Sequence, residues 1–332
     1  MVMEKDMKKK FFWGIAAAAI LALPVLDSDY LLRVMTMAGI YVILALSLNL
    51  VTGYAGQFCL GWAAFYGIGA YTSALLSIHY HLSFWLALPA AGGVAALFGI
   101  ALGLPTMRLR DIYLAITTMG FGEIIRLVLL NWSDLTRGSM GLPGIPAPAF
   151  FGISMDNGYF YYYLALALAG VTILAMDRIV DSRLGRALIA IREDEVAAKS
   201  MGIPTTRYKI TAFTVGAFFA GIAGSFYAHY TSFIDPQSFS FGESTIILAM
   251  VVLGGMGSIR GSVFGAVALT LLPELLRDIA EYRMIVFGLI MMVVMLVRPQ
   301  GIFGAGSVHF AGLRAFKFRH QEVGIHHAVR SE

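Results

Sequence analysis

One stretch, DRIVDSRLGRALIAIREDEVAAKSMGIPTTRYK (Asp177–Lys209), decides how the rest of the chain is interpreted. It holds seven Lys/Arg and five Asp/Glu and lies between two long apolar runs. From Leu184 to Met201, apolar residues recur at three- and four-residue spacing, which predicts an amphipathic helix. Ser182 can cap its start, and Gly202 followed by Pro204 predicts its end. We therefore expect a soluble amphipathic helix on one side of a membrane, where a partner docks.

The composition is that of a protein built inside a bilayer. Hydrophobic residues make up 58% and charged residues 13% of the 332 residues, whereas soluble domains carry about 25% charged residues. The apolar residues come in runs of about 20, the length at which a helix crosses a membrane. Cys59 is the single cysteine, which excludes an internal disulfide and a cysteine-rich metal site. The sequence predicts an all-α polytopic membrane protein.

About ten membrane-spanning helices are expected. The first apolar run follows a basic segment, as in a signal peptide, but it lacks a small-residue cleavage site and further spans come directly after it. We therefore interpret it as a retained span. The eighth and ninth spans are short and broken by glycine. The expected spans lie at about Phe11–Leu26, Leu31–Thr52, Gln57–Ile78, Phe84–Leu104, Ile112–Trp132, Tyr159–Met176, Ile210–Tyr230, Ser244–Met256, Ser262–Leu276 and Met284–Val297.

The distribution of basic residues predicts the orientation. With both termini in the cytoplasm, 19 of the 24 Lys/Arg fall on cytoplasmic segments, in agreement with the positive-inside rule. The basic N-terminus (1–10), the charged loop (177–209) and the polar tail (304–332) are then cytoplasmic. The membrane domain covers 11–303, and its loop 133–157 faces outward. Because the net charge of +4 follows from topology, it does not indicate a nucleic-acid partner.

Two soluble segments leave their roles open. The outer loop is rich in Gly and Pro, and it fits a lid, a docking surface for an external partner, or an irregular connector equally well. The tail has scattered histidines without supporting Cys or carboxylate ligands, so we expect a solvated tail rather than a metal site. These histidines are His309, His320, His326 and His327.

Glu123 and Arg126 are a pair of charges inside the fifth expected span. At a spacing of three residues they lie on neighbouring positions of one helix face. Charges in a membrane are costly, so they pair with each other or face a cavity. They line a substrate path or gate, where Glu123 could meet an ammonium group, or they form a mutually neutralised structural pair, or they lie nearer one end of the span than the expected boundaries. Thr117, earlier in the same span, is a further tentative path residue.

Glycines and polar residues gather where the second and third spans meet, in SLNLVTGYAGQFCLG. Non-helical backbone at membrane depth is tolerated only where it is buried in protein or lines a cavity. Asn49, Thr52 and Gln57 are therefore candidates for a translocation path, although tight helix packing would give a similar pattern. The junction VVLGGMGSIRGSVFG repeats two of these glycines, which is weak evidence for an internal repeat.

Sequence motifs for chemistry are missing. There is no G-x-x-x-x-G-K-[ST] phosphate loop, so we expect no Walker-type ATP site in this chain. H-E-x-x-H and G-x-S-x-G are absent as well. An enzyme is therefore not expected.

Several segments closely resemble LivM-type permeases, the membrane subunits of bacterial ABC importers for branched-chain and other hydrophobic amino acids. The resemblance covers about residues 30 to 304 in order. The matching segments are Leu48–Tyr71, Thr117–Ile145, Arg183–Phe213, Val251–Ala266 and Arg298–Gly304. Within the outer loop, Arg137 and Met140 depart from the family's pattern of small residues.

This resemblance implies an ABC importer permease fold and a cytoplasmic loop that inserts into a groove of an ATPase subunit. The residues to which that coupling role would fall are Gly185, Arg186, Glu193, Asp194, Glu195, Ala198 and Gly202. It also implies the partners: a second homologous permease, two ABC ATPases that bind ATP and magnesium, and a periplasmic or lipid-anchored substrate-binding protein. This chain would then bind no cofactor itself and would lie in the bacterial cytoplasmic (inner) membrane.

Other functions stay open at this stage. Related permeases handle urea, short amides and small carboxylates, and the substrate would be selected largely by the binding protein. A secondary transporter should carry ion-coupling carboxylates in its spans, and Glu123 is the one clear candidate. A purely structural or sensory membrane subunit would explain neither the glycine-broken spans nor the charged loop.

Overall fold

The computed structural model describes residues 29–106, 109, 111–150, 153–154 and 157–275, with 288, 292, 296 and 301–303. The basic N-terminus, the first expected span, most of the tenth and the polar tail lie outside the described residues. The total of ten spans and the location of both termini therefore stay predictions. The expected helical class is confirmed.

Within the described part, five helices are long and apolar enough to cross a membrane. They are α2 (Asp29–Asn49) with the π-helix η2 (Leu50–Tyr54), α4 (Phe84–Thr106), α5 (Asp111–Asn131), α7 (Gly158–Asp181) and α10 (Thr205–Thr231). Three further helices are α3 (Trp62–Tyr80), α11 (Phe241–Gly254) and α12 (Ile259–Leu275). The second to ninth expected spans are thus each present as a helix, although several ends are shifted by one or two turns.

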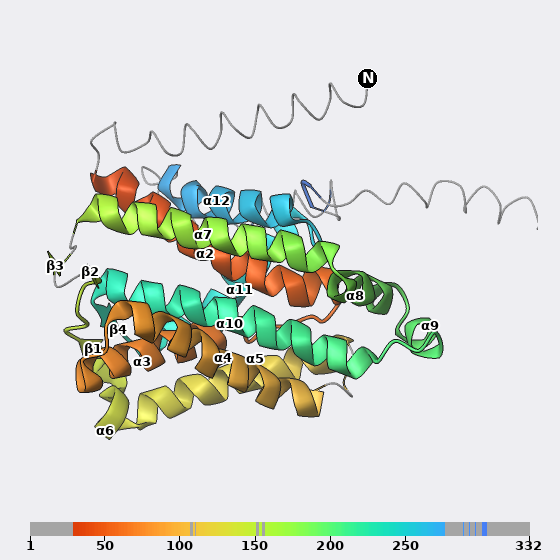
Figure 1. The fold of residues 1–332 in the computed structure, drawn as a ribbon, viewed down its shortest axis with the longest axis horizontal. Coiled ribbons are helices and arrows are strands. Elements are labelled where there is room, and N and C mark those ends of the chain that lie inside the picture. Colours follow the sequence, from red (N-terminus) through yellow and green to blue (C-terminus); the bar gives the residue numbers. More distant parts are fainter. Residues whose placement is uncertain are drawn as a thin grey trace, which may run out of the picture.

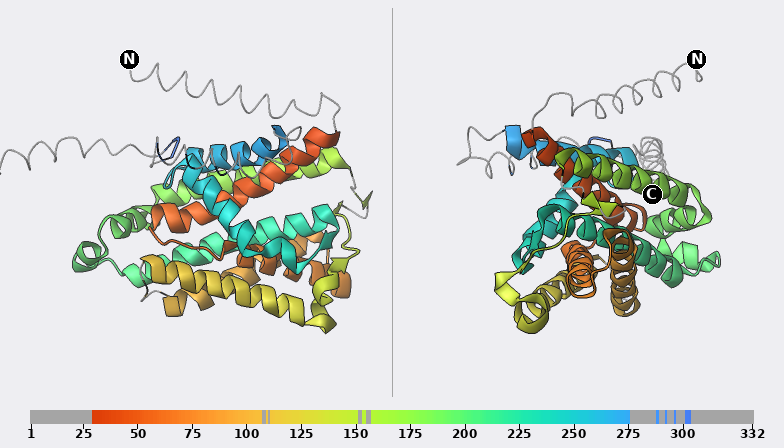
Figure 2. Two further views of the ribbon diagram at one scale, coloured as in Figure 1. Left: turned by 180° about the vertical axis from the view of Figure 1, so that it is seen from behind. Right: turned by 60° about the vertical axis from the view of Figure 1, so that its left-hand side comes forward.

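The helices form two groups with α10 between them. One group holds α2, α7 and α12, and the other holds α3, α4 and α5 (Figure 1). Helix α10 packs on α3 and α4 on one side and on α2 on the other. The charged loop forms α8 (Arg183–Glu193) and α9 (Glu195–Ser200) at one end of the bundle. The views of Figure 2 show the short strands at the opposite end, so the two soluble loops lie on opposite sides.

Small residues on α10 let its neighbours approach at backbone distance. A Cβ added at Gly224 would collide with the carbonyl oxygen of Tyr66 on α3. One added at Gly221 would lie 2.8 Å from the carbonyl oxygen of Ala91 on α4. Close approach through small residues drives helix association in lipid, where apolar burial gives little advantage. The arrangement of the bundle therefore depends on this glycine-rich face.

The chain between α2 and α3 is not helical although it is largely buried. After η2, residues 55–61 run without regular structure, and Gln57 and Cys59 are buried among them. The helix ends near Gly56, whose φ of 68° is left-handed, a conformation that glycine adopts without strain. The expected helix break is confirmed, but the expected start of the third span at Gln57 is wrong, because α3 begins at Trp62.

A second glycine turn separates α11 from α12. Gly255 and Gly257 both have positive φ, at 116° and 76°. The amides of Ile302 and Phe303 donate to the carbonyls of Leu253 and Gly254 at 3.0 and 2.9 Å, closing the end of α11. The two glycine-rich junctions noted in the sequence are therefore both true helix breaks.

The outer loop is attached to the bundle at several points. It forms α6 (Ser133–Thr136), the 3-10 helix η3 (Gly138–Met140), β1 (Leu142–Pro143), β2 (Ala149–Phe150) and β3 (Ile153–Ser154). Strand β1 pairs antiparallel with β4 (Phe233–Ile234), which follows α10 and precedes the 3-10 helix η4 (Pro236–Phe239).

A buried histidine on α10 also holds this loop. The Nδ1–H of His229 donates to the carbonyl of Pro146 at 2.7 Å, since a carbonyl can only accept. Its Nε2 then accepts from the Ser73 hydroxyl of α3 at 2.9 Å. The middle of the loop is therefore connected through one ring to two core helices.

The glycine packing of α10 can be tested by adding a single methyl group. Gly224→Ala should lower the free energy of unfolding in detergent by about 1–3 kcal/mol, and with it the melting temperature. The added Cβ meets the backbone of α3 at Tyr66, which can shift only together with its helix. Gly93→Ala on α4 is the matched control, since a Cβ there has no atom within 4 Å. It should leave the melting temperature unchanged or raise it slightly. Equal shifts for the two variants would contradict this account.

Candidate functional site

The charged loop (177–209) folds as two short helices rather than one. The expected single helix from Leu184 to Met201 is wrong, because Asp194 is extended, with φ −156° and ψ 109°. Its carboxylate accepts hydrogen bonds from the amides of Val196 and Ala197 at 2.8 and 3.0 Å, so it caps the start of α9. Asp competes with helix in this way wherever its side chain can bond amides two or three residues on.

Both ends of the loop follow the predicted capping pattern. The hydroxyl of Ser182 accepts from the amide of Leu184 at 3.1 Å, which confirms it as the N-cap of α8. After α9, Ile203 N donates to Ala198 O and Gly202 N to Lys199 O. These are the two hydrogen bonds of a Schellman motif, and Gly202 takes the left-handed conformation that the motif needs, with φ 83°.

The residues expected to couple to an ATPase divide by what they contact. Ala198 and Gly185 are buried, and a Cβ at Gly185 would collide with the carbonyl of Val180 at the end of α7. Asp194 and Gly202 shape the backbone, as described above. Arg186 and Glu193 are exposed to solvent. Arg186 also donates to the carbonyl of Asp181 at the end of α7, at 2.7 Å. Of the seven predicted residues, four therefore build the loop, two are exposed, and Glu195 contacts the bundle.

Glu195 ties α9 to the bundle. Its Oε1 lies 2.7 Å from the Nζ of Lys209, in the second turn of α10. The Lys209 side chain is only 1% exposed, so its charge has left water almost entirely. Breaking such a pair by removing one partner leaves an uncompensated buried charge. The loop is thereby joined to α10 by an ion pair whose cation is buried.

Two apolar side chains of the loop face solvent. Met201, the last residue of the expected amphipathic helix, is 83% exposed. The break at Asp194 turns α9 relative to α8, which moves Met201 out of line with the buried Leu188 and Ile191. Val196 on α9 is 62% exposed, and Met201 is the C-cap of that helix. The tip of the loop therefore presents an apolar pair beside charged residues.

The predicted path residues at the α2–α3 break lie at the end of the bundle that carries α8. The Oδ1 of Asn49 accepts from the amide of Gly257 at 2.9 Å, and its Nδ2 donates to the carbonyl of Ser258 at 3.3 Å. Thr52 and Gln57 are buried, and one side-chain oxygen of each makes no hydrogen bond. The structure thus joins the two glycine-rich junctions through one amide side chain.

The predicted path residues of α5 lie elsewhere. Arg126 and Glu123 pair, with Nε donating to the two carboxylate oxygens at 3.0 and 3.1 Å, and Arg126 also reaches Gln237 of η4 at 3.3 Å. The Glu123 side chain remains 43% exposed. Thr117 is exposed and donates only to the Tyr113 carbonyl of its own helix. These three residues lie on α5, and none of these hydrogen bonds reaches the α2–α3 break.

Sequence reasoning missed the residues that satisfy the broken backbone. Thr118, not Thr117, faces the break, and its hydroxyl accepts from the amide of Leu60 at 3.0 Å. The hydroxyl of Ser244 on α11 accepts from the amide of Ala63 in the first turn of α3 at 2.9 Å. Polar residues within apolar runs were the available signal.

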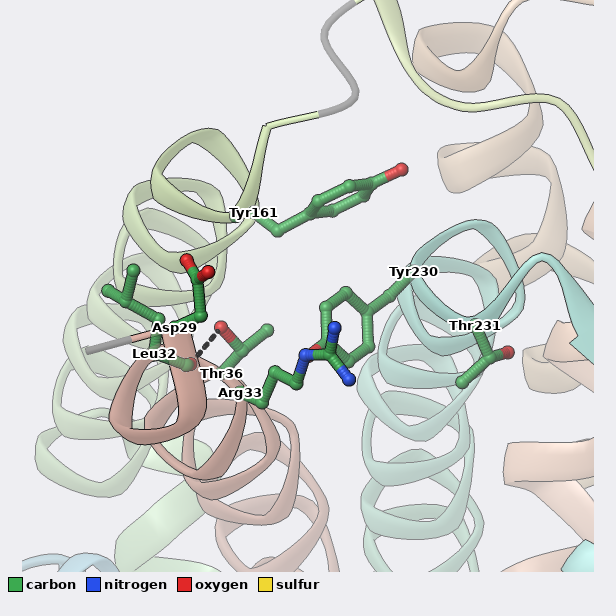
Figure 3. A pocket seen from close by; sticks show the side chains of 8 residues that line it. Asp29, Leu32, Arg33, Thr36, Tyr161, Tyr230 and Thr231 are labelled. Atoms are coloured by element: carbon green, nitrogen blue, oxygen red, sulfur yellow. Dashed lines mark hydrogen bonds between the residues drawn. The ribbon is translucent and has the colours of Figure 1, made fainter. Parts of the chain in front are cut away.

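A cavity of about 500 Å³ opens at the end of the bundle away from α8 (Figure 3). Charged Asp29 and Arg33 of α2 line it, together with the rings of Tyr161 from α7 and Tyr230 from α10. Its volume lies in the range of small-molecule pockets. None of the predicted path residues lines it, so it is a separate feature of the end of the bundle that carries the short strands.

Comparison with known sequences identifies the family. The sequence family described as "Branched-chain amino acid transport system / permease component" matches residues 30–295. The chain belongs to this family. It is 43% identical over 319 residues to the high-affinity branched-chain amino acid transport system permease protein LivM of Salmonella typhimurium, covering 89% of this chain and 75% of the relative.

Two other relatives are also branched-chain amino acid permeases by name. The LivM protein of Escherichia coli is 42% identical over the same coverage. The permease protein LivH of Salmonella typhimurium is 29% identical over 301 residues, 82% of this chain and 94% of the relative. No solved structure matches. The permease therefore has relatives under two names in one organism, both described as branched-chain amino acid permeases.

The orientation of the permease can be tested by labelling. Ser139 in the outer loop and Ser200 in α9 are both exposed, and Cys59 is buried. A membrane-impermeant maleimide should label Ser139→Cys in intact cells and Ser200→Cys only after the cells are opened. The unsubstituted protein, with its buried thiol, is the background control. The reversed pattern would overturn the assignment of sides.

Proposed function

We propose that this chain is a membrane-spanning permease subunit of a bacterial ABC importer of branched-chain amino acids, located in the cytoplasmic membrane. The observation that carries the proposal is the α8–α9 loop, a capped and rigid projection of a membrane bundle. The substrate class is inferred from the printed names of the relatives. The chain is not an enzyme in this proposal, because ATP and magnesium bind to two partner ATPases.

The tip of the loop is a suitable docking element for an ATPase. Exposed Val196 and Met201 offer apolar anchors, and the exposed Arg186 and Glu193 elsewhere on the loop offer charges. An apolar centre with a polar rim is the usual composition of a reversible interface. The ion pair of Glu195 with the buried Lys209 holds the loop to α10 when the ATPase moves. A movement of the ATPase would then pass to the helices as a rigid-body movement.

The partner permease would dock on α5. In the apolar stretch of α5, only 17% is buried, the lowest share among the five candidate spans of the described part. Its open face carries Thr117 and Gly120, next to the half-exposed Glu123. A charged pair facing lipid is costly, whereas facing a path between two subunits it can be solvated. The similarity to LivH supports a second homologous permease as that subunit.

Transport would proceed by alternating access. A periplasmic or lipid-anchored binding protein delivers the amino acid at the outer side. Closure of the two ATPases on ATP pulls the loops and reorients the permease pair around a path that includes α5. A zwitterion with an apolar side chain fits walls that are mostly apolar with few polar groups, and specificity resides largely in the binding protein.

The function can be tested on the complex purified from the native host. The tagged permease, isolated in mild detergent, should carry a second permease and two Walker-containing ATPases, read by mass spectrometry. In proteoliposomes with the binding protein outside and ATP inside, it should accumulate labelled leucine, with competition by isoleucine and valine. Uptake competed by urea or short amides instead would change the substrate class. Uptake without ATP would exclude the ABC mechanism.

The α5 interface predicts different effects for two glycines. A Cβ at Gly120 on α5 or at Gly170 on α7 meets no atom within 4 Å in this chain, so neither position is needed for its own folding. Gly120→Leu should remove the second permease from the purified complex or stop uptake, because close helix approach needs small residues. Gly170→Leu should do neither. Loss of partner or uptake with both variants, or with neither, would reject α5 as the interface.

A further inference from the structure

A single side chain, Arg192, connects the cytoplasmic loop to the broken helix inside the bundle. Its Nη1 donates to the carbonyl oxygen of Gly53 in η2 at 2.8 Å. Its Nη2 donates to Glu193 Oε1, also at 2.8 Å. Arg192 belongs to the last turn of α8, next to the break at Asp194. A residue of the loop thus binds the backbone of the second expected span through one nitrogen and a neighbouring loop carboxylate through another.

The surroundings of Arg192 are glycines that leave room for it. A Cβ at Gly56 would lie 2.9 Å from its Cγ, and a Cβ at Gly257 would lie 2.7 Å from its Nη1. Both glycines have left-handed φ, of 68° and 76°. The two helix breaks, far apart in the sequence, thus form the two walls of one arginine site.

The carbonyl of Gly53, which Arg192 binds, lies at the end of the helix, where carbonyls lack partners within the helix. The last four carbonyls of a helix have no partner within it. At the end of η2, Ala55 N reaches Leu50 O at 3.2 Å and Gln57 N reaches Val51 O at 3.0 Å, and the carbonyl of Gly53 is taken by the guanidinium instead. A cation is favoured there by the helix dipole as well. Arg192 therefore stabilises the broken end of the second span directly.

The α11–α12 turn is bound to the same place. Asn49, one turn before Gly53, holds the amide of Gly257 and the carbonyl of Ser258. Displacement of Arg192 would therefore pull on η2 and, through Asn49, on the turn between α11 and α12. The second anchor of the loop, Lys209, belongs instead to the continuous helix α10.

We propose that Arg192 is the positioning residue that transmits movement of the α8–α9 loop to both broken helices. The inference rests on the proposed function, since it takes the loop as the site where an ATPase acts. In this arrangement, Glu195 and Lys209 hold the loop to a helix that does not break, and Arg192 drives the two that do. Loss of its guanidinium leaves the loop docked and the ATPases active but separates them from the path.

The test compares Arg192→Met with Arg192→Lys in the complete complex. Met keeps the length of the stem without a donor, and Lys keeps a charge with one point of contact in place of the fork. Arg207→Met, at an exposed position in the first turn of α10, is the control. ATP hydrolysis and leucine uptake are measured on the same proteoliposomes, and their ratio is the readout.

For Arg192→Met, we expect ATP hydrolysis within about twofold of the original and leucine uptake per ATP lower by about tenfold, within the usual span of coupling between sites. Arg192→Lys should recover part of the loss, and Arg207→Met should behave as the original. An unchanged uptake per ATP in Arg192→Met would overturn the proposal. Absence of any ATP-driven uptake in the unsubstituted complex would instead reject the proposed function.

A second measurement decides the matter if Arg192→Met does not assemble. Amide hydrogen exchange in the unsubstituted complex, with and without trapped ATP, should change together at residues 54–57 and 255–258, on the two walls of the arginine site. In Arg192→Lys that joint change should become smaller. Exchange that is insensitive to ATP at both segments would overturn the role of Arg192.

Discussion

Backbone groups at membrane depth must find partners within the protein, and the break between α2 and α3 makes this constraint severe. Residues 55–61 are largely buried without being helical, where each unsatisfied group costs several kcal/mol. Partners come from distant segments: Thr118 of α5 accepts from the amide of Leu60, and just before this stretch Arg192 of α8 donates to the carbonyl of Gly53 in η2. The broken helix is therefore stabilised by groups from α5 and from the charged loop.

The same requirement explains why the centre of the bundle is built from small residues. Hydroxyl and guanidinium groups can reach the break only if the surrounding helices lie close together. Gly61 lies against the backbone of Thr118, and Gly224 lies against that of Tyr66. Glycine in these helices is unfavourable for helix propensity, and the close approach that it allows is what offsets this cost.

The sequence predicted elements well where local chemistry decides them. Ser182 and Gly202 bound the loop as expected, since a cap depends on two or three neighbouring residues. The loop's interior was predicted less well, because helical periodicity does not reveal that Asp194 bonds to the amides ahead of it. The exposure of Met201 follows from that one break. Local competition between side chain and backbone is invisible to a count of apolar spacings.

The candidate path was predicted only in part, for a different reason. Polar residues in apolar runs were identified, but one position on a helix is a rotation of about 100°. Thr117 therefore points outward whereas Thr118 meets the break. Nor could spacing show that Asn49 contacts Gly257, more than two hundred residues later, or that the two glycine junctions share one arginine. Those contacts depend on how whole helices pack.

The two anchors of the cytoplasmic loop differ in what they hold, and this gives the loop a mechanical asymmetry. Lys209 belongs to α10, an unbroken helix of 27 residues packed on both helix groups. Arg192 binds a carbonyl that a π-helix has left without a helical partner. A force on the loop meets a stiff element at one anchor and two hinged elements at the other. In the proposed mechanism, its displacement would fall on Gly53 in the π-helix η2 and on Gly257, whose backbone is left-handed.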